Sequence, residues 1–180
     1  MPRITPLERT AASGPARVLL DAVQATLGTT PNLMKTLAAA PAALKGFLDL
    51  NEALAAGVLD RRFREQIAIT VAQANRCDYC LAAHHVLGGL AGLTPDEMAR
   101  NRDARSGELR REAGLQFAKA VVAERGQVSD AALSSVRAAG FGDAEIVEIV
   151  ANVALNVLTN YINHVAQTIV DFPPVAAKAA

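Results

Sequence analysis

The chain has 180 residues, the usual size of a single domain with one hydrophobic core. Hydrophobic residues make up 51% of it and aromatic residues only 4%, so Ala, Leu and Val must supply most of the packing volume, as in closely packed helices. The 18 Lys and Arg residues balance the 18 Asp and Glu residues. Because no excess of positive charge is available to bind phosphates, nucleic acid is not expected as a partner.

The sequence also lacks the features of a secreted or membrane protein. Its first residues contain no apolar stretch of the kind found in signal peptides, and no uninterrupted apolar run reaches the roughly 18 residues that span a bilayer. Its 2 cysteines are too few for a secreted disulfide framework, and in a reducing compartment a close pair is typical of redox or metal sites. We therefore expect a soluble, cytoplasmic protein with no membrane partner.

In the first half of the chain, apolar residues recur at helical spacing, and glycines or prolines separate one helical stretch from the next. Thr30 and Asp60 stand where helix N-caps are expected. The predicted helices cover residues 15–27, 31–39, 41–56 and 60–75.

The second half predicts five more helices and no convincing strand. Thr94, followed by Pro95, and Asp143 are the candidate N-caps here. Leu109 starts a row of apolar residues at spacings of four, which indicates a helix. These helices cover residues 78–90, a short stretch from 94, residues 108–125, a short stretch from 129 and residues 143–168.

Together the elements predict an all-α, single-domain helical bundle over residues 15–172. Residues 1–14 show little periodicity and form an N-terminal arm, and a proline pair opens a C-terminal tail over residues 173–180. The helix over 143–168 carries more apolar surface than one side of such a bundle can bury. Exposed patches of this kind usually meet another chain, so we expect a homo-oligomer.

The segment with the clearest chemistry is Cys77-Asp78-Tyr79-Cys80, followed by His84. Cys77 falls at the N-terminus of the predicted helix, where free amides and the helix dipole lower a thiol pKa. His84 comes one turn after Cys80 on the same helix face, close enough for proton transfer directly or through water. A CxxC pair brings two sulfurs within disulfide reach, so one can attack a substrate and the other can resolve the adduct.

Glu65 lies on the preceding predicted helix, next to apolar residues. An ionised carboxylate in such surroundings usually needs a partner, and a histidine or a thiol is a candidate. The alternative is an ordinary salt-bridged helix residue. We group Glu65 with Cys77, Cys80 and His84 as the candidate site.

These four positions form the pattern Glu, eleven residues, Cys-x-x-Cys, three residues, His. In this pattern the chain resembles the alkylhydroperoxidase D family, within the carboxymuconolactone decarboxylase-like group. All three spacings match, and the helical layout is compatible over roughly residues 40–165. The resemblance implies an all-α fold, assembly as trimers or hexamers, and thiol-dependent reduction of peroxides, an antioxidant activity.

Carried over by position, the resemblance makes Cys80 the peroxidatic thiol, Cys77 the resolving thiol, and His84 with Glu65 the proton relay. The implied partners are a hydroperoxide substrate and a thiol or dithiol reductant, of which a lipoyl-type dithiol is one candidate. We expect no cofactor and no metal. The best-characterised members place a histidine immediately before the second cysteine, whereas this chain has Tyr79, whose pKa is too high for easy proton relay.

Other interpretations of the cysteines stay open. One is a buried structural pair, and another is half of a zinc site. In the zinc site the two cysteines and a histidine would need Glu65 or His164 as a further ligand, since there is no second CxxC. A disulfide reductase or dithiol relay that never meets peroxide is favoured by Tyr79. A redox-sensing or structural oligomeric protein would use the dithiol only to report redox state. Decarboxylation, the other chemistry of the wider group, does not call for a vicinal dithiol.

Three further features receive weaker interpretations. His164 belongs to an unusually polar stretch, residues 160–164, of the long helix, and with Tyr79 it is a candidate auxiliary residue, although an interface histidine is the simpler interpretation. His85 projects about 100° around the helix from His84, so we assign it to solvent or a subunit contact. The arginine-rich run 100–111 also contains acidic residues and predicts a solvated connection.

Overall fold

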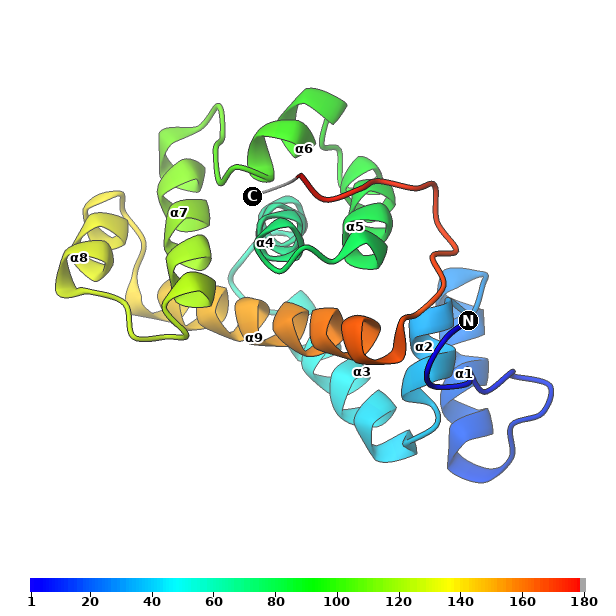
Figure 1. Cartoon of the computed structure of the whole chain (residues 1–180). Coiled ribbons are helices and arrows are strands. Elements are labelled where there is room, and N and C mark those ends of the chain that lie inside the picture. Colours follow the sequence, from blue (N-terminus) through cyan, green and yellow to red (C-terminus); the bar gives the residue numbers. More distant parts are fainter. Residues whose placement is uncertain (179–180) are drawn as a thin grey trace.

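The computed structural model describes residues 1–178, and over that range the chain forms nine helices and no strand (Figure 1). The all-α prediction is confirmed, and each predicted helix is present close to its expected ends. The helices are α1 (Gly14–Leu27), α2 (Asn32–Leu37), α3 (Pro41–Ala55), α4 (Arg61–Ala74), α5 (Asp78–Leu90), α6 (Pro95–Asn101), α7 (Leu109–Ala123), α8 (Asp130–Ala138) and α9 (Asp143–Ala166).

The helix ends follow local chemistry. The carboxylate of Asp60 accepts the Phe63 N–H at 2.9 Å and caps α4, as predicted. Thr94 and Glu97 form a capping box at the start of α6, in which each side chain accepts the other residue's backbone N–H. Gly28 ends α1 with a positive φ of 71°, a conformation that glycine adopts without a steric penalty.

Two local predictions are wrong. Thr30 does not cap α2, because its Oγ1 donates to Gln24 Oε1 at 2.9 Å. Asp143 is the first helical residue of α9 and follows the N-cap Gly142. Both errors concern a helix start, where the boundary is shifted by one residue from the expected one.

Helix α4 lies at the centre of the molecule and contacts α5, α6, α7 and α9 (Figure 1). Its residues 66–72 are all buried. Ile69 and Ala72 pack into a cluster shared with α1, α2, α3 and α5, whereas Ile67 and Val71 pack into a second cluster shared with α7, α8 and α9. A helix that is buried on all sides is typical of a core element, and α4 holds the two halves of the fold together.

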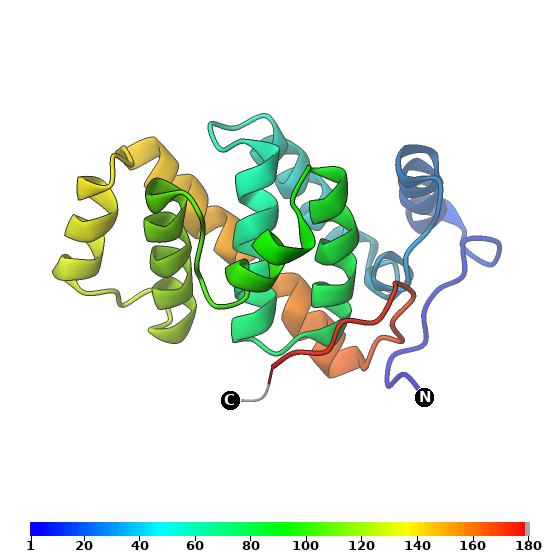
Figure 2. The same ribbon diagram turned by 90° about the horizontal axis from the view of Figure 1, so that it is seen from above.

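Helix α9 crosses α4, α5 and α7 and contacts all three (Figures 1 and 2). Among the described residues it is the one helix long and apolar enough to cross a membrane by length and composition alone. However, it packs on five other helices, α2, α3, α4, α5 and α7, and carries the buried polar residues Asn152, Asn156, Asn160 and Asn163. We therefore interpret α9 as a core helix of the bundle.

Both ends of the described chain lie against the helical body. The N–H of Arg3 donates to the carbonyl of Ala166 at 2.7 Å, which ties the N-terminal arm to the end of α9. Residues 171–178 cross the start of α5 (Figure 2), and the N–H of Ala177 donates to the Asp78 carboxylate at 2.7 Å. The C-terminal segment therefore lies next to the CxxC motif.

Candidate active site

A tight turn between α4 and α5 positions the CxxC motif. Arg76 adopts a positive φ of 54°, and the following N–H, that of Cys77, donates back to the carbonyl of Ala72 at 2.9 Å. Cys77 is the N-cap of α5, and its Sγ accepts the N–H of Cys80 at 3.3 Å. The predicted position of Cys77 at the helix N-terminus is thus present, and it favours negative charge on this sulfur in the reduced protein.

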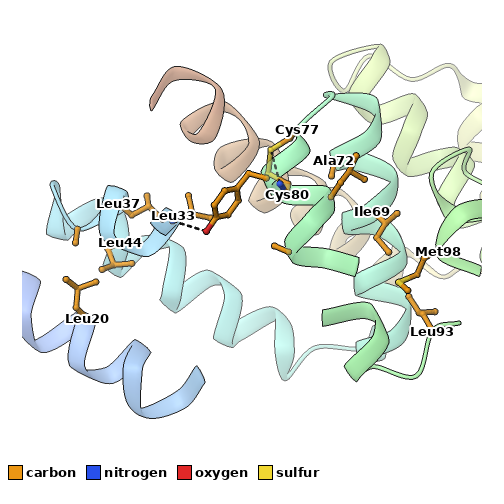
Figure 3. Close-up of a cluster of buried hydrophobic side chains, with 14 residues drawn as sticks. Leu20, Leu33, Leu37, Leu44, Ile69, Ala72, Cys77, Cys80, Leu93 and Met98 are labelled. Carbon is orange, nitrogen blue, oxygen red and sulfur yellow. Dashed lines mark hydrogen bonds between the residues drawn. A yellow bond between two sulfur atoms is a disulfide. The ribbon is translucent and has the colours of Figure 1, made fainter. Parts of the chain in front are cut away.

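Cys77 and Cys80 form a disulfide, with Cα atoms 5.2 Å apart (Figure 3). They are only 1% and 3% exposed, respectively. Both belong to the cluster of buried residues that includes Ile69 and Ala72 of α4 and Leu37 of α2. The sulfurs are therefore close together but shielded from solvent, and a reagent can reach them only after local movement.

Glu65 and His84 face each other across the contact between α4 and α5. The Oε2 of Glu65 lies 2.8 Å from the Nδ1 of His84, and the two side chains are 16% and 20% exposed. A carboxylate at this position fixes the orientation of the imidazole ring and accepts the Nδ1 proton, which leaves Nε2 to exchange protons with another group. His84 lies one turn after Cys80 on α5, so the sequence motif places a proton-exchanging ring on the helix that carries the disulfide.

Tyr79 is part of the packing around the disulfide. Its hydroxyl accepts the N–H of Leu33 at 3.0 Å, and its ring packs edge-to-face on Phe172, with centroids 5.6 Å apart. Burial raises the pKa of Tyr79 well above its ordinary value, although the Leu33 N–H acts in the opposite direction. Tyr79 therefore remains protonated at neutral pH and links α5 to α2.

The other two histidines lie outside the dithiol contacts. His164 is exposed, and its Nε2 lies 2.8 Å from the carbonyl oxygen of Asn75, two residues before the first cysteine. His85 Nδ1 lies 2.8 Å from the carbonyl oxygen of Leu81 in its own helix. Burial lowers the pKa of His85. His164 thus contacts the turn that carries the dithiol, whereas His85 contacts only its own helix.

The sequence analysis missed Asn163. This residue is 4% exposed on α9, and its Nδ2 lies 3.3 Å from the Sγ of Cys80. Nearby, Asn75 Nδ2 donates to the Oδ1 of Asn160 at 2.9 Å. A recognisable signal was present, because Asn152, Asn160 and Asn163 lie at near-helical spacing on one face of an otherwise apolar helix.

Charged residues of the arginine-rich connection form ion pairs. In the arginine-rich connection, Arg105 pairs with Glu112 at 3.0 Å and Arg111 with Asp60 at 3.1 Å. Within residues 1–178, no group of three or more His, Cys, Asp or Glu side chains is arranged to hold a metal ion. Among the described side chains, the amide of Asn163 donates to the Sγ of Cys80.

Comparison with known proteins gives one family match. Residues 41–120, which include the whole CxxC region, match the sequence profile of the Carboxymuconolactone decarboxylase family. No curated protein sequence matches the chain.

Several solved structures share the complete fold. The alkylhydroperoxidase core structure of a peroxidase-related protein from Ralstonia eutropha JMP134 is 26% identical, with 94% of this chain and 92% of that chain covered and a TM-score of 0.84. A peroxidase-related protein from Silicibacter sp. TM1040 is 23% identical, with 97% and 93% covered and a TM-score of 0.78. The debrominase Bmp8 is 18% identical, with 94% and 92% covered and a TM-score of 0.79, a likeness of fold alone. The family resemblance seen in the motif is confirmed.

Proposed function

We propose that this chain, which belongs to the carboxymuconolactone decarboxylase-like family and has the alkylhydroperoxidase D-like fold, is a thiol-dependent peroxidase. The observation that carries the proposal is the Cys77–Cys80 disulfide at the start of α5, one turn before a histidine bonded to Glu65. Two vicinal sulfurs can alternate between dithiol and disulfide, and the acid–base pair can supply and remove the protons that this cycle needs.

In the proposed cycle, the Cys80 thiolate attacks the terminal oxygen of a hydroperoxide. The O–O bond breaks, a sulfenic acid forms on Cys80, and the alkoxide leaves with a proton from the His84–Glu65 relay. Cys77 then attacks the sulfenic sulfur, which releases water and forms the disulfide present in the structure. An external dithiol returns the protein to the reduced form and is itself oxidised to a disulfide.

We also propose a homo-oligomer, a trimer or hexamer, that acts in the cytoplasm. The outward face of α9 exposes Val147, Leu158, Tyr161 and Val165, and it borders two apolar hollows of about 260 and 300 Å³. A second copy would cover this surface. A cytoplasmic location supplies the reducing environment in which a dithiol cycle turns over.

A disulfide reductase or dithiol relay is the second candidate. Tyr79 favours it, because burial raises the pKa of Tyr79 and its hydroxyl is already bonded to Leu33, so it cannot supply the acid–base function of a histidine. The debrominase among the similar structures also means that the fold alone does not specify the substrate. The choice between the candidates rests on which compound reacts with Cys80.

The deciding experiment measures consumption of an organic hydroperoxide by the protein with dihydrolipoamide as reductant. The proposal expects turnover in the wild type and none in Cys80→Ser. In Cys77→Ser, dimedone should trap a sulfenic acid on Cys80 that mass spectrometry can locate. Turnover that survives Cys80→Ser contradicts the proposal. Reduction of lipoamide disulfide without peroxide consumption supports the dithiol relay, and absence of both activities supports a sensing or structural role.

A further inference from the structure

Asn163 contacts the sulfur that would react with the substrate. The Nδ2 of Asn163 lies 3.3 Å from the Sγ of Cys80, and the side chain is almost completely buried. Its other amide atom, Oδ1, has no hydrogen-bond partner among the described residues. A buried polar atom without a partner costs free energy, and such atoms are rare enough in proteins to call for an explanation.

We propose that Asn163 stabilises the thiolate of Cys80 by donating a hydrogen bond to its Sγ. This inference rests on the proposed function, in which Cys80 is the reacting thiol. A disulfide sulfur is a weak acceptor, whereas a thiolate accepts a charge-assisted bond. The Asn163 bond therefore becomes stronger when the disulfide is reduced, and it favours ionised Cys80 over neutral Cys80.

The N-terminus of α5 by itself would stabilise the thiolate of Cys77, not that of Cys80. Cys77 is the N-cap of α5 and accepts the N–H of Cys80, so the helix N-terminus favours negative charge on Cys77. The donor to Cys80 comes from α9, a separate element 83 residues away in the chain. Without this donor, the backbone would stabilise only the Cys77 thiolate. With it, each sulfur has one N–H donor.

The same contact assigns a direction to the reduction step. A thiolate of the external dithiol attacks the Sγ of Cys77, the S–S bond breaks, and the electron pair leaves on Cys80 as a thiolate that Asn163 stabilises. The second thiol of the reductant then attacks the mixed disulfide and releases Cys77 with a proton. The protein gains two electrons, and the reductant becomes a disulfide.

The test measures the thiol pKa of one cysteine at a time, by iodoacetamide alkylation against pH and mass spectrometry. In a Cys77→Ser background, where Cys80 is the remaining thiol, Asn163→Leu should raise the Cys80 pKa by about one unit. Asn163→Asp should raise it further, because a carboxylate repels the thiolate. In a Cys80→Ser background, Asn163→Leu should leave the Cys77 pKa unchanged, which a general loss of structure would not do.

Asn156→Leu is the matched control. Asn156 is also a buried asparagine on the inward face of α9, but its Nδ2 donates to the carbonyl of Asn152 at 2.8 Å. This substitution should leave the Cys80 pKa unchanged. Equal Cys80 pKa values in wild-type, Asn163→Leu and Asn163→Asp proteins overturn the inference.

If the Asn163 variants do not fold, the Cys77→Ser protein alone decides, because a Cys80 pKa at or above about 8.5 contradicts a stabilised thiolate. Alkylation requires no peroxide and no physiological reductant. The inference about Asn163 can therefore fail while Cys80-dependent peroxidase activity is present, and it can hold in a protein that reduces no peroxide. The two failures are thus distinguishable.

Discussion

The Nδ1 of His84 lies 2.8 Å from the Oε2 of Glu65, and this contact joins the helix of the dithiol to the central helix of the fold. Both side chains are largely buried, so neither is free to sample many orientations. The pair therefore has the fixed geometry that a proton relay needs, since general acid–base catalysis depends on the position of the ring as well as on its protonation.

The first prediction is that His84→Gln and Glu65→Gln slow peroxide reduction. Removing a general acid–base typically costs between about 10²- and 10⁴-fold in rate, and we expect His84→Gln to fall in this range. Glu65→Gln should have a smaller effect, because the ring remains while its orientation and tautomer are no longer fixed by a carboxylate. Initial rates at saturating dihydrolipoamide measure both effects.

His85→Gln is the control for this prediction. His85 is the next residue on α5 and is partly buried, but its ring bonds the carbonyl of its own helix at Leu81. It should retain a rate close to that of the wild type. A His84→Gln protein with full activity would remove His84 from the relay.

The second prediction concerns Tyr79. Tyr79→Phe leaves the N–H of Leu33 without its acceptor, and an unpaired buried donor costs about 1 to 3 kcal/mol. Chemical denaturation at neutral pH should show a loss of this size. The rate of disulfide reduction in the folded protein should change little, because the hydroxyl is bonded to α2 and not to a sulfur.

The Tyr79 substitution should also change the pH dependence of stability. Burial raises the pKa of Tyr79 above its ordinary value of 10.0, so above that pH the unfolded chain loses a proton that the folded protein retains. Unfolding is then favoured, and the wild type should lose about 1.4 kcal/mol per pH unit from this group. Tyr79→Phe lacks this loss, so the difference in free energy of unfolding between the wild type and Tyr79→Phe should decrease as the pH rises above 10.0. A difference that stays constant up to pH 11 would contradict a raised Tyr79 pKa.

The sequence predicted most of the helices because glycines, prolines and capping residues mark their ends locally. It also predicted a partner for Glu65, since the motif spacing pairs two positions on adjacent helices. Asn163 was not predictable in the same way. Its contact with Cys80 joins two residues 83 positions apart, and a single sequence does not fix how α9 is rotated about its own axis against α5.

The third prediction tests assembly through the outward face of α9. Leu158→Glu places a charge among exposed apolar side chains, including Tyr161 and Val165, and a charge buried in an apolar contact is strongly unfavourable. We expect the oligomer to dissociate to a smaller species while the helical content measured by circular dichroism is retained. Sedimentation velocity gives the mass of each species.

Val18→Glu is the matched control for assembly. Val18 is an exposed valine on α1, outside the α9 face. Its substitution should leave the mass unchanged. A wild type that is monomeric at micromolar concentration, or a Leu158→Glu protein with the wild-type mass, would show that this face does not hold the copies together.

The fourth prediction concerns the C-terminal segment, which lies beside the first cysteine. Val175 and Ala177 pack against the cluster that contains Cys77, and the N–H of Ala177 donates to the Asp78 carboxylate at 2.7 Å. Deletion of residues 173–180 removes this cover, so the 1% exposed Cys77 should become accessible. We expect dithiothreitol to reduce the disulfide at least several-fold faster than in the wild type.

Asp78→Asn is the control that keeps residues 173–180 and changes only their hydrogen bond to α5. It weakens the anchor of Ala177 from a charge-assisted to a neutral bond while the segment stays in place, so its reduction rate should lie between those of the wild type and the deletion. The rates are measured by following free thiols with time, and circular dichroism checks that each protein is folded. If the deletion and the wild type are reduced equally fast, the barrier to reaching Cys77 lies instead in the packing of α2 and α4 around the sulfurs.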